Sequence, residues 1–304
     1  MDPRGPRGRP ARVRIASFSR RGRPSYGVVR AGGIVDAGRQ LGVELPDLAS
    51  VLAADALDEL HALAADAEPE LALADVDLLP VITRPDKILC VGINYRPHVE
   101  ETGRDAPQRP VLFTRFPGSQ VGHRQPLVRP SVSRKFDYEG ELAVIIGRRG
   151  RHIAPEGALR HVAGYSCFND GSVRDYQRHS SQFTAGKNFA RSGGFGPWLT
   201  TADEIGDPAR LSLETRLNGA VMQSADVADL IFDVPALISY CSTFAELLPG
   251  DVIVTGTPGG VGYVRSPPVY LQPGDVVEVD IPGVGVLRNG VVDEVDALER
   301  GEAE

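Results

Sequence analysis

The chain has 304 residues, of which 42% are hydrophobic and 24% charged, so it is long enough to fold around a sizeable core. Its formal net charge of −7 argues against nucleic acid as the main partner, and no apolar stretch approaches the roughly 20 residues that cross a bilayer. The three cysteines lie far apart and match neither a disulfide framework nor a zinc cluster, which indicates a reducing compartment. We therefore expect a cytoplasmic protein with no membrane or nucleic-acid partner.

The first 80 residues predict a small N-terminal α/β domain, which precedes a larger catalytic domain over residues 81–304. Residues 1–10 are mainly Pro, Gly and Arg and are expected to be disordered. Residues 13–18 and 26–29 are typical of strands. Residues 45–67 predict a helix, because their leucines recur at helical spacings.

A short apolar strand over residues 87–92 leads into a loop with a candidate acid–base pair. His98 and Glu101 are three residues apart, so on a short helix they share one face within hydrogen-bonding reach. A glutamate beside a histidine holds one imidazole tautomer and raises its basicity, as a general base for water requires. A surface histidine without a chemical role is the alternative that this pair alone leaves open.

Residues 142–146 form a continuous apolar run that ends at Gly147 and predicts a buried strand, and acidic residues lie just before it in the stretch 137–147. In a strand Asp137, Glu139 and Glu141 point the same way, with the last two about 7 Å apart at Cα. No Lys or Arg lies between them in the sequence, so a divalent metal would neutralise their repulsion; a solvated strand end is the alternative. Asp170 follows the next predicted strand, residues 162–168. Three carboxylates without a ligating Cys or His pair predict Mg²⁺ or Mn²⁺ rather than Zn²⁺.

The segment after Asp170 adds further charged residues. Arg174 and Asp175 are expected to form an ion pair that braces the loop. Lys187 follows Gly186 without the glycine spacing of a phosphate loop. Lys187 can bind a substrate oxyanion or pair with the carboxylates, and both roles stay open.

Most of the remaining chain predicts strands, so we expect a β-rich α+β fold rather than a doubly wound sheet. Its predicted parts are a tight glycine loop at 193–198, a strand at 211–217 turning at Asn218-Gly219, a helix over 233–248, a strand at 251–255 and a hairpin over 276–289. The loop that begins at Gly256 lets backbone approach a ligand closely, but it lacks the spacing of a dinucleotide site.

Taken in order and spacing, these motifs over residues 87–292 resemble the fumarylacetoacetate hydrolase superfamily, which includes acylpyruvate hydrolases and 2-hydroxyhepta-2,4-diene-1,7-dioate isomerases. The resemblance implies a mixed β-roll catalytic domain, a Mg²⁺ or Mn²⁺ site and usually a homodimer. Several residues fall on the family's functional positions: Glu139, Glu141 and Asp170 on its metal ligands, His98 and Glu101 on the catalytic dyad of a lid that orders over substrate, and Lys187 and Thr257 on contacts with the oxo-acid end.

Two parts of the chain, the lid and Arg115, depart from the family pattern. The lid often has Tyr-Ala-Asp/Glu-His, whereas this chain has Tyr95-Arg96-Pro97-His98, which stiffens the approach to His98 and adds a charge at the pocket mouth. Arg115 stands where many relatives carry lysine. It can clamp a substrate carboxylate with two hydrogen bonds or brace the loop at Pro117-Gly118.

These residues favour metal-dependent hydrolysis of a carbon–carbon bond in an acylpyruvate-like 2,4-dioxo acid. The metal would act as a Lewis acid on the enolate, Lys187 would stabilise its charge, and His98 with Glu101 would activate water. The enzyme alternative is decarboxylation or isomerisation of 2-oxo or 2-hydroxy-diene dioates such as oxaloacetate or aromatic catabolites. The altered lid also motivates a non-catalytic alternative, a ligand-binding protein on the same fold.

Overall fold

The computed structural model describes residues 13–103 and 105–299, so the predicted disorder of residues 1–10 lies outside the described residues. The strands are β1 Arg14–Arg20, β2 Arg23–Arg30, β3 Gly33–Asp36, β4 Leu71–Ala72, β5 Asp77–Leu78, β6 Ile88–Gly92, β7 Val111–Thr114, β8 Gln120–Val121, β9 Leu127–Arg129, β10 Phe136–Asp137, β11 Gly140–Ile146, β12 Val162–Asn169, β13 Ser172–Val173, β14 Gly193–Thr201, β15 Ser212–Leu217, β16 Ala220–Asp226, β17 Val252–Val254, β18 Val276–Ile281 and β19 Gly285–Asp293. The α-helices are α1 Gly38–Leu41, α2 Leu48–Ala53, α3 Leu57–Ala65, α4 Arg96–Thr102, α5 Arg174–Gln177, α6 Thr184–Lys187, α7 Ala202–Ile205, α8 Val234–Phe244 and α9 Glu294–Glu299.

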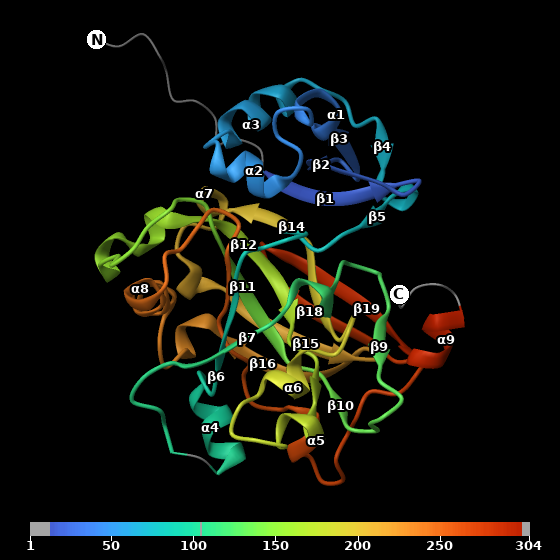
Figure 1. Cartoon of the computed structure of the whole chain (residues 1–304), viewed down its shortest axis with the longest axis vertical. Coiled ribbons are helices and arrows are strands. Elements are labelled where there is room, and N and C mark those ends of the chain that lie inside the picture. The colour runs from blue at the N-terminus through green and yellow to red at the C-terminus, as the bar shows by residue number, and fades with distance from the viewer. Residues whose placement is uncertain (1–12, 104, 300–304) are drawn as a thin grey trace.

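Mixed sheets dominate the described part of the chain (Figure 1). A 12-stranded sheet has the order β4-β3-β2-β1-β14-β12-β11-β17-β6-β7, with β5 paired to β1 and β8 paired to β14. A five-stranded sheet has the order β16-β15-β18-β19-β9, and β10 pairs with β13. The predicted β-rich α+β class with a mixed β-roll is confirmed. No helix in the described residues is long and apolar enough to cross a membrane.

The N-terminal strands extend the large sheet, because β1 pairs with β14 and places Ile15 opposite Leu199. Helices α2 and α3 lie over these strands (Figure 1). The predicted single helix over 45–67 is wrong: Asp55 has a left-handed φ of +55°, which ends α2 before α3 begins. A division of the chain near residue 80 stays a prediction.

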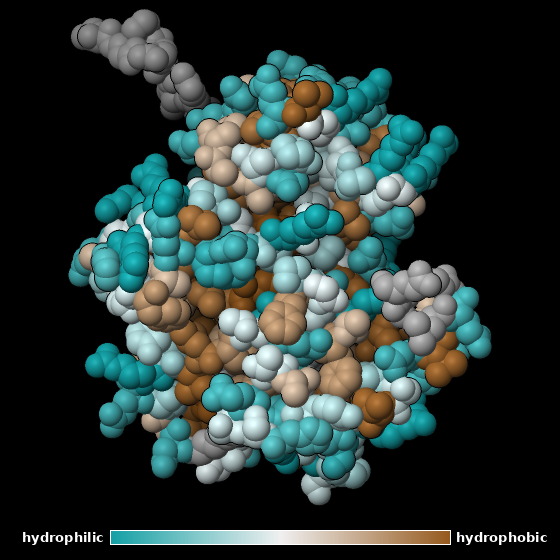
Figure 2. Space-filling view, viewed as in Figure 1, coloured by the Kyte–Doolittle hydropathy of each residue, from teal (hydrophilic) through white to brown (hydrophobic). Residues whose placement is uncertain are grey.

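Strand β11 carries the centre of the core, and residues 142–146 are fully buried, as the apolar run predicts. It pairs with β12 on one side and β17 on the other. The register sets Gly140 opposite Asn169, so the acidic start of β11 lies beside the end of β12. Polar side chains cover much of the outer face, with apolar side chains in patches between them (Figure 2).

Two further predictions are corrected. Residues 193–198 do not form a tight loop but begin β14, where glycine is required by close packing: a Cβ at Gly194 would lie 2.6 Å from Asn289 Oδ1. Helix α8 is capped by Asp233 as expected, but it ends at Phe244 instead of 248, and the Phe244 side chain is exposed. The hairpin at Asn218-Gly219 is confirmed, with φ of +52° and +84° at these two residues.

Candidate active site

Three carboxylates meet where β11 begins and β12 ends. Glu139 precedes β11, Glu141 lies within it, and Asp170 directly follows β12. The amide of Asp170 donates to the Glu139 carbonyl at 2.8 Å, which ties the two segments together. One carboxylate oxygen from each residue lies within 4.8 Å of the others, and all three residues are buried. The structure thus brings together the three residues predicted as metal ligands.

Cations from distant parts of the chain also reach this cluster. Lys187 Nζ lies 2.6 Å from Glu139 Oε2 and 2.6 Å from Asp170 Oδ2. Arg174 Nη1 lies 2.6 Å from Glu139 Oε1, so Arg174 pairs with Glu139 and with Asp137 rather than with Asp175 as predicted. Lys187 and Arg174 therefore neutralise part of the carboxylate charge, although neither lies between Glu139 and Glu141 in the sequence.

Glu141 still lacks a cationic partner. Among the described residues no Lys or Arg forms an ion pair with it, and the Gly256 amide donates to its Oε2 at 2.5 Å. Burial raises the pKa of Glu141 well above its usual range, and Asp170 and Glu139 raise it further. Burial also acts to raise the pKa of Glu139, but Lys187 and Arg174 outweigh it and lower that pKa to about 2.

The donor set fits a hard divalent cation. It offers only carboxylate oxygens in a buried position, which suits Mg²⁺ or Mn²⁺. Glu141 would supply the charge that the protein leaves uncompensated, and Glu139 and Asp170 would complete the ligand set. A divalent metal can therefore be held by these three side chains.

The candidate acid–base pair lies on α4, a helix that confirms the short helix expected here. His98 Nδ1 lies 2.7 Å from Glu101 Oε1, and His98 is buried. The other oxygen of Glu101 accepts a 2.7 Å hydrogen bond from the amide of Gly260 in the glycine-rich loop. The proline of the altered lid occupies the first turn of α4, where proline is tolerated, so it leaves this pair intact.

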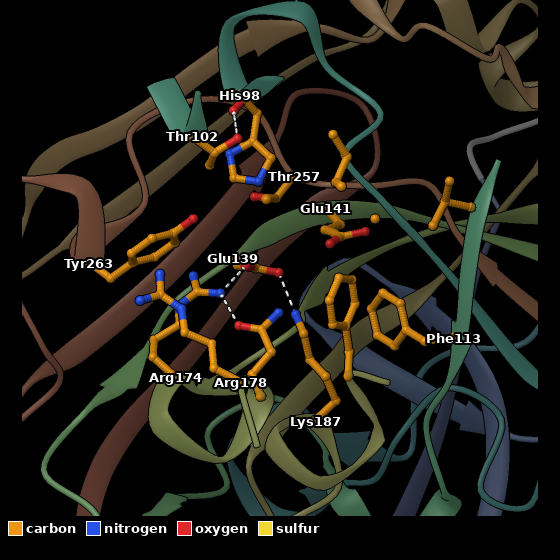
Figure 3. A pocket seen from close by; sticks show the side chains of 15 residues that line it. His98, Thr102, Phe113, Glu139, Glu141, Arg174, Arg178, Lys187, Thr257 and Tyr263 are labelled. Atoms are coloured by element: carbon orange, nitrogen blue, oxygen red, sulfur yellow. Dashed lines mark hydrogen bonds and ion pairs between the residues drawn. The ribbon is translucent and has the colours of Figure 1, made fainter. Parts of the chain in front are cut away.

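The pocket between α4 and the carboxylates is small, with a volume of about 50 Å³. Figure 3 shows the His98 imidazole pointing from α4 into it, toward Thr257 and Glu139. Lys187 lies on the opposite side, so the pocket separates the acid–base pair from the charged cluster (Figure 3). The lining residues are Val91, Gly92, Ile93, His98, Thr102, Phe113, Glu139, Glu141, Arg174, Gln177, Arg178, Phe183, Lys187, Thr257 and Tyr263.

The predicted substrate contacts differ in position. Thr257 lines the pocket and donates to the Gly140 carbonyl at 3.1 Å. Gly256 has a φ of +107° and turns its amide toward Glu141. Arg115 is 2% exposed and donates to Asp170 Oδ1 at 2.5 Å and to Ser192 Oγ at 2.8 Å. Arg115 thus holds Asp170 and Ser192 in this structure, and its predicted contact with a substrate carboxylate stays a prediction.

Several lining residues were not singled out from the sequence as site residues. Arg174 follows Asp170 by four residues, and this spacing on a turn could have suggested a place beside the carboxylates. Arg178 and Tyr263 line the pocket because tertiary folding brings their segments together, and no local sequence pattern predicts this.

Comparisons with known proteins support the family resemblance seen in the sequence motifs. A family model described as fumarylacetoacetate (FAA) hydrolase C-terminal matches residues 87–292. The mitochondrial oxaloacetate tautomerase FAHD2A of Homo sapiens is 43% identical over 221 residues, which cover 72% of this chain and 70% of that protein.

Two solved structures are similar to this protein over most of the chain. A maleylpyruvate hydrolase from Sphingobium sp. SYK-6, in complex with manganese(II) and pyruvate, is 31% identical with a TM-score of 0.77, covering 92% of this chain and 99% of that one. A 2-hydroxyhepta-2,4-diene-1,7-dioate isomerase from Mycobacterium marinum is 30% identical with a TM-score of 0.71, covering 93% and 99% respectively. The similar proteins are thus enzymes with hydrolase, isomerase or tautomerase names.

Proposed function

Because the chain belongs to the fumarylacetoacetate hydrolase family, we propose that it is a divalent-metal-dependent enzyme that enolises a small 2-oxo acid. One observation carries the proposal: the oriented His98–Glu101 pair faces a small pocket whose opposite wall is the carboxylate cluster. The likeness to an oxaloacetate tautomerase at 43% identity supports this choice among the reactions of the family.

The small pocket favours a compact substrate. A cavity that holds one water molecule has a volume of roughly 10–15 Å³ on the same measure. The pocket volume of about 50 Å³ therefore accommodates a group of a few heavy atoms, such as the oxo-carboxylate end of a substrate. A long acyl tail would have to leave through the mouth. The pocket volume therefore favours enolisation of a short acid over the acylpyruvate hydrolysis that the sequence predicts.

His98 is the proposed proton carrier. Its Nδ1 hydrogen donates to Glu101, which leaves Nε2 as the acceptor directed into the pocket. Nε2 takes a proton from the carbon next to the oxo group and returns it to the oxo oxygen, and this transfer converts the keto acid into its enol. Bound Mg²⁺ or Mn²⁺ would supply Lewis-acid stabilisation of the negative charge that develops on oxygen.

Lys187 contributes a fixed positive charge. Its burial acts to lower its pKa, but Asp170 and Glu139 outweigh this effect and raise the pKa, so the amine stays protonated. A permanently charged lysine cannot serve as a base, but it stabilises developing negative charge. We therefore propose an electrostatic role for Lys187, which also holds Glu139 and Asp170 together.

A second candidate is hydrolysis of a carbon–carbon bond in a 2,4-dioxo acid. The His98–Glu101 pair favours it, because the same geometry suits activation of a water molecule. The likeness to a maleylpyruvate hydrolase solved with manganese(II) and pyruvate is consistent with this chemistry. The non-catalytic alternative loses its motivation, since Arg96 and Pro97 do not disturb the pair.

Proton exchange tests the proposal. Purified protein with Mg²⁺ or Mn²⁺ in D₂O should speed deuterium incorporation next to the oxo group of oxaloacetate, followed by NMR, and EDTA should abolish the effect. His98→Gln should lose exchange, whereas His152→Asn, at an exposed site with φ +53° that asparagine tolerates, should retain it.

Hydrolysis is tested in parallel with acetylpyruvate. Release of pyruvate and acetate without faster exchange on oxaloacetate would favour the second candidate. Failure of both reactions with either metal would contradict both. A cytoplasmic location and a homodimer remain proposals, supported by composition and by the family resemblance respectively.

A further inference from the structure

Arg178 is an exposed arginine at the mouth of the pocket, and no carboxylate among the described residues pairs with it. It directly follows α5, is exposed, and lines the pocket beside Gln177 and Tyr263. Its guanidinium carbon lies 4.8 Å from the centre of the Tyr263 ring. Within residues 13–103 and 105–299, no carboxylate forms an ion pair with it.

The neighbouring cations contrast with Arg178. Arg174 also lies over the Tyr263 ring, at 4.5 Å, but both Asp137 and Glu139 bind it. Lys187 is likewise held by two carboxylates. Arg178 is therefore the lining cation, among the described residues, that remains available to an anionic ligand.

The charge balance of the carboxylate cluster indicates which kind of anion Arg178 could bind. With all four carboxylates ionised, as metal binding requires, Asp137, Glu139, Glu141 and Asp170 carry one more charge than Arg115, Arg174 and Lys187 balance, which leaves one negative charge in the described cluster. A divalent cation would turn this into one positive charge, which the carboxylate next to the substrate's oxo group neutralises. A second substrate carboxylate would then need a cation of its own.

We infer that Arg178 is a specificity-determining residue that binds the distal carboxylate of a short dicarboxylic 2-oxo acid. The inference rests on the proposed function and narrows its substrate class. The cation–π contact with Tyr263 keeps the guanidinium beside the pocket, where its fork can bind a carboxylate through two hydrogen bonds. An acid whose oxo end occupies the small pocket would extend its other end toward this arginine.

The experiment compares acids that differ only in the distal group. Deuterium exchange is measured on oxaloacetate and on 2-oxobutanoate, and binding of 2-oxoglutarate and 2-oxopentanoate is measured by calorimetry with Mg²⁺ present. Arg178→Gln should raise KM and Kd for the dicarboxylates about 10- to 100-fold, with kcat and the monocarboxylates changed by less than about threefold. Arg178→Lys should recover part of the loss, because it keeps the charge without the fork.

Arg210→Gln is the control, because Arg210 is exposed and does not line the pocket. Equal losses on both acids of a pair, or no loss with Arg178→Gln, would overturn the inference. If the wild type catalyses no exchange but binds 2-oxoglutarate in an Arg178-dependent way, the proposed function fails and the assignment of Arg178 stands.

Discussion

Replacing Glu141 by glutamine is expected to stabilise the metal-free protein and to remove its response to Mg²⁺. Glu141 is 1% exposed, and burial, Asp170 and Glu139 all act against its charge. The amide has the same shape and can still accept the hydrogen bond from Gly256. By analogy with other buried charges replaced by neutral groups, the gain should be about 1–4 kcal/mol, or on the order of 2–10 °C in Tm.

Glu139→Gln provides the matched control with the opposite sign. Glu139 has two cationic partners, Lys187 and Arg174, and glutamine would leave both without that carboxylate. We expect it to lower the free energy of unfolding by about 3–5 kcal/mol, the usual cost of breaking a buried ion pair from one side. The two neighbouring substitutions should thus shift Tm in opposite directions.

Calorimetric melting in EDTA and in excess Mg²⁺ measures both effects. The raised pKa of Glu141 means that its stabilising contribution is present at low pH and is lost as pH rises through the folded-state value. Wild type in EDTA should therefore lose stability toward alkaline pH relative to Glu141→Gln, and Mg²⁺ should restore it only in the wild type. A Tm in EDTA as low for Glu141→Gln as for Glu139→Gln would refute the charge argument.

Further predictions concern acid stability, catalysis and the N-terminal helices. Because the pKa of Glu139 falls from 4.5 to about 2, its contribution is present above pH 4.5 and should fade between these values in a wild-type acid titration; Glu139→Gln should show a smaller loss over that window. His98→Gln should slow deuterium exchange by about 10²–10⁴-fold while calorimetric Mg²⁺ binding persists, and an unchanged rate would remove His98 from the mechanism. Asp55→Gly should raise the free energy of unfolding in urea by about 0.5–1 kcal/mol, since glycine adopts the φ of +55° without strain; a decrease would contradict this reasoning.

The metal triad could be predicted because it depends on local rules. Strand alternation gives Glu139 and Glu141 one direction, and the position of Asp170 at a strand end follows from the apolar run before it. The i,i+3 spacing of His98 and Glu101 likewise predicts their contact at 2.7 Å. Each of these inferences needs only the period of a helix or a strand.

The remaining parts of the site depend on distant segments. Lys187 reaches Glu139 across 48 positions, and Arg115 reaches Asp170 across 55, so no local pattern reveals that the cluster is already partly neutralised. The conformational freedom of Gly194 suggests a turn. In the structure, however, glycine is required there because the side chain of Asn289, almost 100 residues later, leaves no room for a Cβ. Tertiary packing overrides local preference at these positions.

The two oxygens of Glu101 give the site a further property. One orients the imidazole of His98, and the other fastens α4 to the body through the Gly260 amide. Under the proposed function, docking of α4 against the glycine-rich loop and orientation of the His98 imidazole are therefore coupled through Glu101. An acid too bulky for α4 to dock would bind while His98 is not oriented, so substrate size would affect kcat as well as affinity.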